Sequence, residues 1–456
     1  MIINDKASPK NLSLQHIFRT WWPLATSWLL MGAESPALSA IVARLEDPEI
    51  NLAAYGGIVL PIAMIIEAPI LMLLSASTAL SRDWQSYKKI WRFMMIVGGI
   101  LTLLHAFIAF TPLYYLIAEK IIGAPQEIIQ PARMGMIIMT PWTWAIAYRR
   151  FHQGVLIRFG YSKAVGFGTA IRLMADLFVL ILGYRIGSVP GVVVATSAVT
   201  IGVLCEAFYV GLVVKPILND LKAIPISKEP LSLRNFLEFY IPLAMTSFLF
   251  LLVQPIGSAA ISRMPNALSS LAVWPVVTGL VFMIRSLGIA YNEVVIALLD
   301  SPKSYFNLRA FTHILFISTI ILLVLITATP LSDLWFSKIQ GINLELTKLA
   351  KSAMWLAVPM PGLNVLQSWY QGSILYGRKT RVVTESVALF LTTACAILIL
   401  GIIWGKLPGL YVGLFAFSLS MCIQTAWLWY RSLPVISYIK SRDKVDVLPI
   451  REVIAK

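Results

Sequence analysis

Charged residues are scarce in this sequence: they make up 13% of its 456 residues, whereas 58% are hydrophobic. A soluble protein of ordinary composition carries about 25% charged residues. The apolar residues gather in long blocks, which a water-soluble core does not need. This composition excludes a soluble globular protein, and no stretch remains for a sizeable soluble domain.

The residues and motifs of catalysis and metal binding are also scarce. Three cysteines and four histidines are present, and the cysteines have neither metal-like nor disulfide-framework spacing. There is no G-x-x-x-x-G-K-[ST] phosphate loop, no H-E-x-x-H pair and no G-x-S-x-G elbow. We therefore expect a protein that is not an enzyme and that needs no metal or cofactor.

Long hydrophobic blocks are abundant instead. Each of twelve blocks can cross a bilayer, which takes about 20 apolar residues. This pattern predicts an all-α membrane protein with twelve transmembrane helices. The predicted spans are 18–43, 52–80, 90–116, 130–157, 163–187, 189–216, 234–261, 266–299, 307–331, 348–375, 382–405 and 409–438.

The even number of spans places both termini on one side of the membrane, and the basic residues identify that side. With cytoplasmic termini, 26 of the 37 lysines and arginines lie inside, Arg149 and Arg150 among them, nine lie outside and two lie within helices. Basic loops stay on the cytoplasmic face, so we expect a multi-pass protein of the plasma (cytoplasmic) membrane. The net charge of +15 then reflects orientation, and no nucleic-acid partner is expected.

The two halves of the chain repeat each other. Pro23 and Pro36 recur at an offset of 219 as Pro242 and Pro255. Further along the offset is 218, as in Ser86-Tyr87 with Ser304-Tyr305, Thr111-Pro112 with Thr329-Pro330, Lys120 and Gly123 with Lys338 and Gly341, and Gln153-Gly154 with Gln371-Gly372. We predict two six-helix lobes, 1–225 and 226–456, related by a pseudo-twofold axis along the membrane normal. The substrate site is expected between them.

Six ionisable residues lie deep in predicted helices, where an unpaired charge is costly and marks function. They are Glu34, Glu67, Arg172, Asp176, Glu206 and Arg285. Arg172 and Asp176 are four residues apart, so they share a helix face and can form an ion pair. That pair is either a self-neutralised structural contact or a site where Arg172 also meets an anionic substrate. Asp176 and Glu206 are candidates for ion coupling, with helix packing as the alternative for Glu206.

Glu67 and Arg285 are matched by the repeat at the offset of 218. An acid and a base therefore occupy equivalent mid-membrane positions, one in each lobe, where they can face each other over a central cavity. We predict that both bind substrate, as Arg172 does: an ion pair between the lobes holds one conformation, and an anion at Arg285 releases it. The alternative is that each satisfies backbone groups in its own lobe.

Prolines are predicted to kink the first helix of each half. A proline inside a helix frees a carbonyl and bends the chain, and Pro36 and Pro255 occupy matching places. Glu34 lies two residues before Pro36, where its carboxylate can take up a proton or another cation. Glu34 is therefore the leading ion-coupling residue; the alternative is a neutral carboxyl held by Ser35 and Ser39.

These features together resemble a known group of proteins. Twelve helices in two lobes, an acid on a proline-kinked first helix, and a threonine-proline before a lysine-glycine loop are similar to the multidrug/oligosaccharidyl-lipid/polysaccharide (MOP) exporter superfamily, which includes the MATE transporters. Within it the chain resembles the progressive ankylosis proteins. The stretches that carry this resemblance are ESPALSAIVARLEDPEINLAAYG (34–56), FIAFTPLYYLIAEKI (107–121) and HQGVLIRFGYSKAVG (152–166).

The resemblance implies a two-lobed exporter with a V-shaped central cavity that releases organic or phosphate-bearing anions, such as citrate, pyrophosphate or nucleotides. It also implies a role for the acid of the first helix, which Glu34 matches with a spacing one residue different.

We therefore expect a secondary-type exporter of small anions that works as a monomer in the lipid bilayer, with proton or sodium coupling both open. Two alternatives remain in the same class: cation-coupled extrusion of amphipathic drugs, which would rely on Glu34 and Glu67, and flipping of lipid-linked saccharides. A non-transporting membrane scaffold is the alternative from a different class.

Overall fold

The regular elements of the chain are all helices. The structure is a computed structural model, and it describes residues 12–225, 231–299, 301, 303–377 and 381–445, among which no strand occurs. The predicted boundary at 225/226 falls beside residues 226–230, which lie outside the described part. The first half contains α1 (Leu14–Val42), α2 (Pro48–Ala54), η1 (Tyr55–Val59), α3 (Leu60–Glu67), η2 (Ala68–Ile70), α4 (Leu73–Leu80), α5 (Trp84–Phe110), α6 (Leu113–Tyr115), η3 (Leu116–Ile122), α7 (Gln126–Ile138), α8 (Thr140–Arg158), α9 (Ser162–Ile186) and α10 (Gly191–Ala223).

The second half follows the same order. It contains α11 (Leu233–Leu251), α12 (Val253–Ile261), α13 (Ala267–Leu298), α14 (Ser304–Ala328), α15 (Leu331–Asp333), η4 (Leu334–Ile339), α16 (Leu344–Ala357), α17 (Pro359–Tyr376), α18 (Arg381–Trp404) and α19 (Gly409–Val445).

Nine helical stretches among the described residues are long and apolar enough to cross a membrane. They are Pro48–Leu80, Trp84–Phe110, Ser162–Ile186, Gly191–Ala223, Leu233–Ile261, Ala267–Leu298, Ser304–Ala328, Arg381–Trp404 and Gly409–Asp443. The other three predicted spans correspond to α1 and to the pairs α7–α8 and α16–α17. These are helical, but they do not combine the length and the apolar character of the nine. The all-helical membrane class is confirmed, and the count of twelve stays a prediction.

Prolines account for the interrupted helices. Pro359 matches Pro141 at the offset of 218, and each lies in the first turn of the second helix of its pair, α8 or α17. Pro61 and Pro69 divide the predicted span 52–80 into short pieces, because a proline removes a backbone donor. In the second half α13 has one internal proline, Pro275, and runs unbroken.

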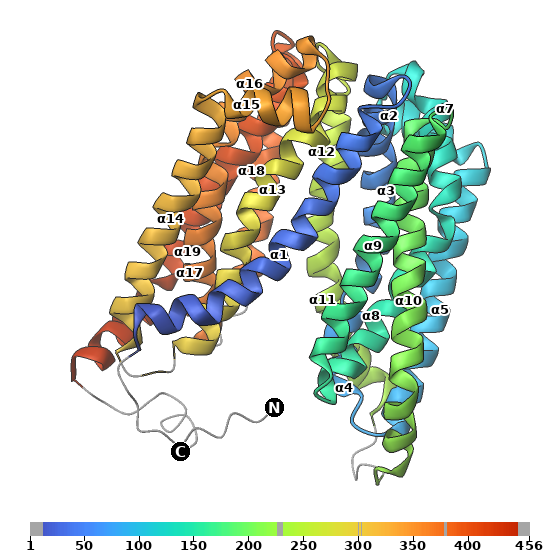
Figure 1. The fold of residues 1–456 in the computed structure, drawn as a ribbon. Coiled ribbons are helices and arrows are strands. Elements are labelled where there is room, and N and C mark those ends of the chain that lie inside the picture. The colour runs from blue at the N-terminus through green and yellow to red at the C-terminus, as the bar shows by residue number, and fades with distance from the viewer. Residues whose placement is uncertain (1–11, 226–230, 300, 302, 378–380, 446–456) are drawn as a thin grey trace.

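The two halves form two groups of helices that meet at one end (Figure 1). Helices α2 to α10 lie on the right, α13 to α19 lie on the left, and α1 and α11–α12 lie between them. We call the end of the molecule where α1 begins and α19 ends the near face. The opposite end, where α1 leads into α2 and α12 into α13, is the far face. This arrangement makes the first helix of each half the element that joins the two groups.

The first helix of each half packs at its start against the other half. Trp21 of α1 donates from Nε1 to the carbonyl of Leu287 in α13 at 3.0 Å. In the opposite sense, the Tyr240 hydroxyl of α11 donates to the carbonyl of Pro69. Tyr240 is the counterpart of Trp21 at the offset of 219, and Leu287 is the counterpart of Pro69 at the offset of 218. The matched contacts thus repeat in reciprocal order between the halves, which extends the sequence repeat to the packing.

A second pair of near-face contacts has the same reciprocity. The Asn307 side chain donates to the Leu12 carbonyl at 2.6 Å, and the Lys89 side chain donates to the Leu231 carbonyl at 2.7 Å. Asn307 matches Lys89 at the offset of 218, and Leu231 matches Leu12 at the offset of 219. Residues matched at the offset of 219 before the shift and at 218 after it therefore make equivalent contacts in the structure.

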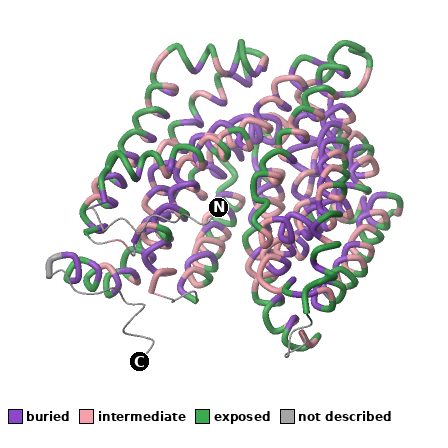
Figure 2. Tube along the Cα trace, turned by 60° about the horizontal axis from the view of Figure 1, so that its bottom comes forward, coloured by how far each residue is buried: buried purple, intermediate pink, exposed green. Residues whose placement is uncertain are grey.

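Large apolar side chains cover the outside of the helices. Leu103, Phe208 and Ile403, for example, are 71%, 70% and 76% exposed. A soluble protein rarely exposes so many large apolar side chains together. Exposed residues follow the outer faces of the helices, while buried residues lie between them (Figure 2). This surface suits a hydrocarbon environment and leaves the polar residues for the interior.

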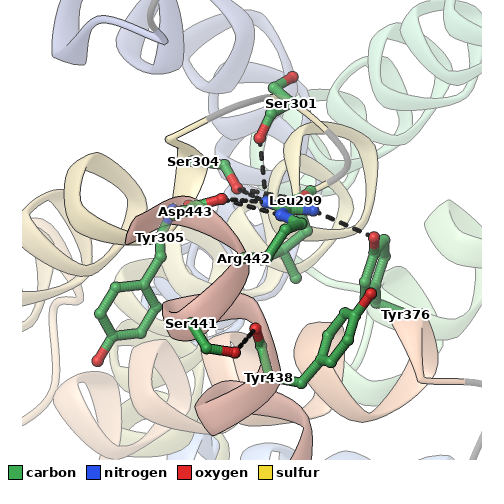
Figure 3. A network of polar contacts seen from close by, with 9 residues as sticks. All are labelled: Leu299, Ser301, Ser304, Tyr305, Tyr376, Tyr438, Ser441, Arg442 and Asp443. Atoms are coloured by element: carbon green, nitrogen blue, oxygen red, sulfur yellow. Dashed lines mark hydrogen bonds and ion pairs between the residues drawn. The ribbon is translucent and has the colours of Figure 1, made fainter. Parts of the chain in front are cut away.

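A buried polar network ties the end of α19 to the start of α14 at the near face (Figure 3). Arg442 donates to Asp443 Oδ1 from Nε at 2.9 Å and from Nη2 at 2.7 Å, and also contacts Ser304 and the Tyr376 hydroxyl. The second oxygen of Asp443 accepts from the backbone N–H of Tyr305 at 2.7 Å. In the first half Asp83 caps α5 at the matching place from within its own loop, so the second half uses a distant helix for the same purpose.

Replacing Asp443 by alanine is expected to lower the free energy of unfolding by about 3 kcal/mol, because it leaves the buried Arg442 without its acid. The matched control is Arg234→Ala, whose exposed ion pair with Glu238 is worth less than about 1 kcal/mol. Thermal unfolding in detergent measures both. Equal melting temperatures for the two variants would show that the network does not hold α19 in place.

Candidate functional site

The candidate site is a cluster of charged side chains inside the first half. It draws Glu34 from α1, Arg149 and Gln153 from α8, Arg172 and Asp176 from α9, and Glu206 from α10. Helices α8, α9 and α10 follow one another along the chain, α1 is distant from them in the sequence, and all four lie together in the fold. Ionisable groups away from water are stabilised by pairing with one another, so the partners of each one define the site.

Arg172 links the first helix to the interior of its half. Its Nη1 lies 2.6 Å from Glu34 Oε2, and its Nε lies 3.3 Å from Glu206 Oε2. The Arg172 side chain is 10% exposed and the Glu34 side chain 19%, so the pair sits at the edge of the buried cluster. The ion pair with Asp176 expected from the four-residue spacing is not formed, because acids on α1 and α10 approach the guanidinium more closely.

Glu206 is the most enclosed member, with a side chain that is 0% exposed. Arg149 forms an ion pair with its Oε2, and the Gln153 amide donates to its Oε1 at 2.8 Å. Both carboxylate oxygens are therefore engaged. Glu206 thus holds α8, α9 and α10 together, which fits its interpretation as a helix-packing residue, and its role in ion coupling stays a prediction.

The second half keeps this geometry without its charge. The counterparts of Arg149 and Glu206 at the offset of 218 are Gln367 and Gln424. Gln367 Nε2 donates to Gln424 Oε1 at 3.1 Å. A neutral amide pair thus replaces the ion pair at the equivalent place, which leaves the charged cluster in the first half only.

Asp176 lies beside this cluster without a partner of its own. It is 3% exposed, and neither carboxylate oxygen accepts a hydrogen bond from a described residue. Its Oδ1 fills the space beside Gly202, where an added Cβ would collide with it. A carboxylate enclosed in this way is costly as an anion, and the predicted role of Asp176 in ion coupling stays a prediction.

Glu67 is buried and Arg285 is half-buried, and the two do not form the predicted ion pair. Glu67 ends α3, is 4% exposed and has an unpartnered Oε2. The charges of Arg150 and Arg149, in its own half, act on it from nearby without a hydrogen bond or ion pair. Arg285 in α13 makes no hydrogen bond or ion pair with any described residue, and its Nε is buried. Glu67 therefore interacts with charges of its own half, and Arg285 has no hydrogen-bonding or ionic partner among the described residues.

Arg149 and Arg150 are the site residues that sequence reasoning missed, because both were counted with the cytoplasmic basic residues. Arg149 is 7% exposed and lies in the middle of α8, and Arg150 has a buried Nε with no partner among the described residues. The repeat carried a signal for them, since the matching Gln367 and Ser368 lie well inside a predicted span.

The two predicted kinks differ. α1 stays helical through Pro36, whose carbonyl accepts from the Gln340 amide at 3.2 Å. In the second half α11 ends at Leu251 and α12 begins at Val253, so the helix is interrupted just before Pro255. Glu34 therefore belongs to an unbroken helix whose middle is tied to Arg172. Among the described residues no group of three His, Cys, Asp or Glu side chains is arranged to hold a metal ion.

Exchanging Arg149 and Glu206 for the residues of the second half tests how the cluster is held. Arg149→Gln alone leaves a buried carboxylate with less compensation and is expected to lower the free energy of unfolding by about 3 kcal/mol. The double variant Arg149→Gln/Glu206→Gln copies the Gln367–Gln424 pair and is expected to recover most of that loss. Melting temperatures in detergent measure both, and a double variant less stable than the single one would contradict this account.

Comparisons with known proteins agree with this architecture. A model of the progressive ankylosis protein family (ANKH) matches residues 12–278. No curated protein matches the chain in sequence. Among solved structures, a multidrug resistance MATE transporter of the MOP superfamily in its inward-facing conformation has a TM-score of 0.67 at 14% identity, over 93% of this chain and 99% of that one.

Two further solved structures show that this fold serves different proteins. The lipid II flippase MurJ in an inward closed conformation has a TM-score of 0.67 at 14% identity, over 93% of this chain and 90% of that one. A MOP superfamily transporter from Pyrococcus furiosus, described with a binding pocket of reverse polarity, has a TM-score of 0.60 at 15% identity, over 94% and 99%. At these identities the likeness establishes the fold.

Proposed function

The chain belongs to the progressive ankylosis protein family, and from this membership we propose that it exports small organic or phosphate-bearing anions by alternating access. The family and the fold make it a membrane transporter of the MOP superfamily and not an enzyme. The resemblance noted in the sequence is thereby confirmed. The substrate class, the direction and the roles of single residues are the content of the proposal.

Arg285 is the observation that carries the proposal. Its guanidinium is fixed inside the second half with no hydrogen-bonding or ionic partner among the described residues. A buried unpaired cation is costly, and a carboxylate or phosphate group would supply the missing partner in the two-pronged geometry that arginine favours. Arg150 offers a second unpartnered guanidinium from the first half.

The distribution of charge supports a site between the halves. The first half encloses four acids, Glu34, Glu67, Asp176 and Glu206, against three arginines, Arg149, Arg150 and Arg172. The second half presents Arg285 at the place where the first half has Glu67. Arg285 and Arg172 are the proposed anion contacts, and Glu67 the acid that competes with the substrate for a cation.

The proposed architecture is twelve spans in two six-helix lobes, 1–225 and 226–456, related by a pseudo-twofold axis along the membrane normal. Its support is the reciprocal near-face contacts of Trp21 and Tyr240 together with the sequence repeat. The basic bias of the loops supports cytoplasmic termini in a plasma membrane protein. We propose that one chain suffices, as a monomer surrounded by lipid.

Ion coupling is assigned to the acids of the first half. Asp176 lacks a partner among the described residues, and Glu34 shares Arg172 with Glu206. A proton or sodium ion taken up by these acids would weaken the hold of Arg172 on α1. The proposal needs no cofactor, because the ion gradient supplies the energy.

Substitution of Arg285 tests the anion site. Cells that express the wild type are expected to accumulate an organic or phosphate-bearing anion in their medium. Arg285→Ala is expected to lower it about ten-fold or more, the effect of losing one charged hydrogen bond, and Glu67→Ala to lower it by removing the acid that alternates with the substrate. Arg285→Lys keeps the charge and should retain part of the export. Mass spectrometry of the medium measures the anion.

Three other outcomes point elsewhere. Media that do not differ between wild type and variants, with altered drug resistance, would favour cation-coupled extrusion, which the excess of acids in the first half would serve. Media that do not differ, with an altered surface glycan, would favour a flippase for lipid-linked saccharides. No difference in any of these would favour the non-transporting scaffold. Each outcome removes the anion proposal.

Coupling is tested in proteoliposomes with an imposed pH or sodium gradient. Export by the wild type is expected to respond to one of the gradients, and Glu34→Gln and Asp176→Asn to abolish that response, because neither variant can take up a cation at the changed position. The exposed Glu238→Gln serves as the matched control and should respond as the wild type does. An unchanged response in Glu34→Gln removes Glu34 from the mechanism.

A further inference from the structure

Two arginines cross between the halves at the far face, and the repeat relates them. Arg44 follows α1, Arg263 follows α12, and the two match at the offset of 219. Each guanidinium also donates to the carbonyl four residues earlier in its own helix, Ala40 or Ala259, which match at the same offset. Neither residue is part of the charged cluster or of the proposed anion site.

The residue two positions before each arginine packs against the arginine's own half. Val42 packs against Gly191 at the start of α10, where an added Cβ would lie 2.8 Å from the valine. The matching Ile261 packs against Gly409 at the start of α19, with a corresponding distance of 2.9 Å. The backbone just before each arginine is therefore in contact with its own half.

The guanidinium groups bind the other half at matching turns. Arg263 donates to the carbonyls of Lys120, Ile121 and Ile122 at 3.0, 2.7 and 2.6 Å. Arg44 donates to the carbonyl of Lys338, which is the counterpart of Lys120 at the offset of 218. The acceptors are the last carbonyls of η3 and η4, and a helix end attracts cations because its carbonyls lack partners.

Glycine makes room for each guanidinium. Gly123 and Gly341 both have φ of +73°, a conformation that residues with a Cβ rarely adopt. A Cβ on Gly123 would also lie 3.2 Å from Arg263 Cζ, and one on Gly341 would lie 2.9 Å from Arg44 Nη1. Each turn thus needs a glycine to admit the arginine of the opposite half, which explains why the glycine recurs in the repeat.

We propose that Arg44 and Arg263 form a twofold-related latch that holds the far faces of the two halves together and that must release before this face can open. The acceptors are neutral carbonyls, so the latch does not depend on the protonation of an acid. Each arginine can exchange its carbonyls for water when the halves separate, and this makes the contact reversible where a buried ion pair between lobes would be hard to break.

The separation of the halves tests the latch directly. Glu127 and Glu345 are exposed, match at the offset of 218, and lie in the first turns of α7 and α16. Spin labels on Glu127→Cys and Glu345→Cys, with the three native cysteines replaced by serine, report the far-face distance in lipid nanodiscs. In Arg44→Ala/Arg263→Ala the population with a longer distance is expected to rise about ten-fold, since hydrogen bonds of two charged groups are lost.

Arg133→Ala is the matched control. Arg133 also donates to backbone carbonyls, those of Ala109 and Phe110, but within its own half. Its distance distribution should equal that of the wild type. An unchanged distribution in the double alanine variant, or an equal change in Arg133→Ala, would overturn the latch.

A cross-linked variant covers the case in which the double alanine protein fails to fold. The Ser269 hydroxyl donates to Glu49 Oε1 at 2.6 Å across the same face, so Glu49→Cys and Ser269→Cys can form a disulfide. In Arg44→Lys/Arg263→Lys, which keeps the charges but loses the two-pronged contact, the longer distance should appear and the disulfide should remove it. A lysine variant identical to the wild type would overturn the proposal. Because the labels report no substrate, either result is independent of the anion proposal.

Discussion

The enclosed carboxylate of Glu206 is the constraint on which the interior of the first half depends. A charge of this kind is tolerable away from water only when several donors surround it, and here Arg149, Arg172 and Gln153 do so from two neighbouring helices. The requirement fixes α8 and α9 against α10. It also reaches α1, since the Arg172 that approaches Glu206 is the residue that binds Glu34. One buried anion thus positions four helices.

Comparison of the two halves separates mechanical contacts from chemical ones. Several contacts that join the halves are kept in both copies, as in those of Trp21 and its counterpart Tyr240 and of Arg44 and its counterpart Arg263. The groups that carry charge inside the halves are not kept, since Gln424 stands where the first half has Glu206 and Arg285 where it has Glu67. An asymmetric site between two symmetric halves requires this combination: the contacts between the halves are retained, and the charged residues inside them differ. In the proposed function, this asymmetry would give the coupling cation and the anionic substrate different halves to bind.

Much of the architecture could be predicted from the sequence, and the pairing of its charges could not. The apolar blocks and the repeat predicted the helices and the reciprocal order of the halves, because hydrophobic length and duplication are properties of the chain itself. Spacing alone paired Arg172 with Asp176, since residues four apart lie about one helical turn from each other. The observed partners, Glu34 and Glu206, come from other helices, and no local rule contains the packing that brings them near. Arg149 escaped notice because it was counted with the cytoplasmic basic residues, and its partner Glu206 lies on a different helix.

Helix α1 offers a physical route between the acids and the movement of the halves. Its start is bonded to the second half through Trp21, its middle to the first half through Glu34, and its end leads to Arg44. A cation taken up at Glu34 would free Arg172 to rely on Glu206 alone, and the middle of α1 would lose its polar attachment to the first half. The polar contacts that remain on α1, from Trp21, the Pro36 carbonyl and Arg44, are then all made with the second half. Loading of one acid can therefore change which half carries α1, without any contact between that acid and the substrate.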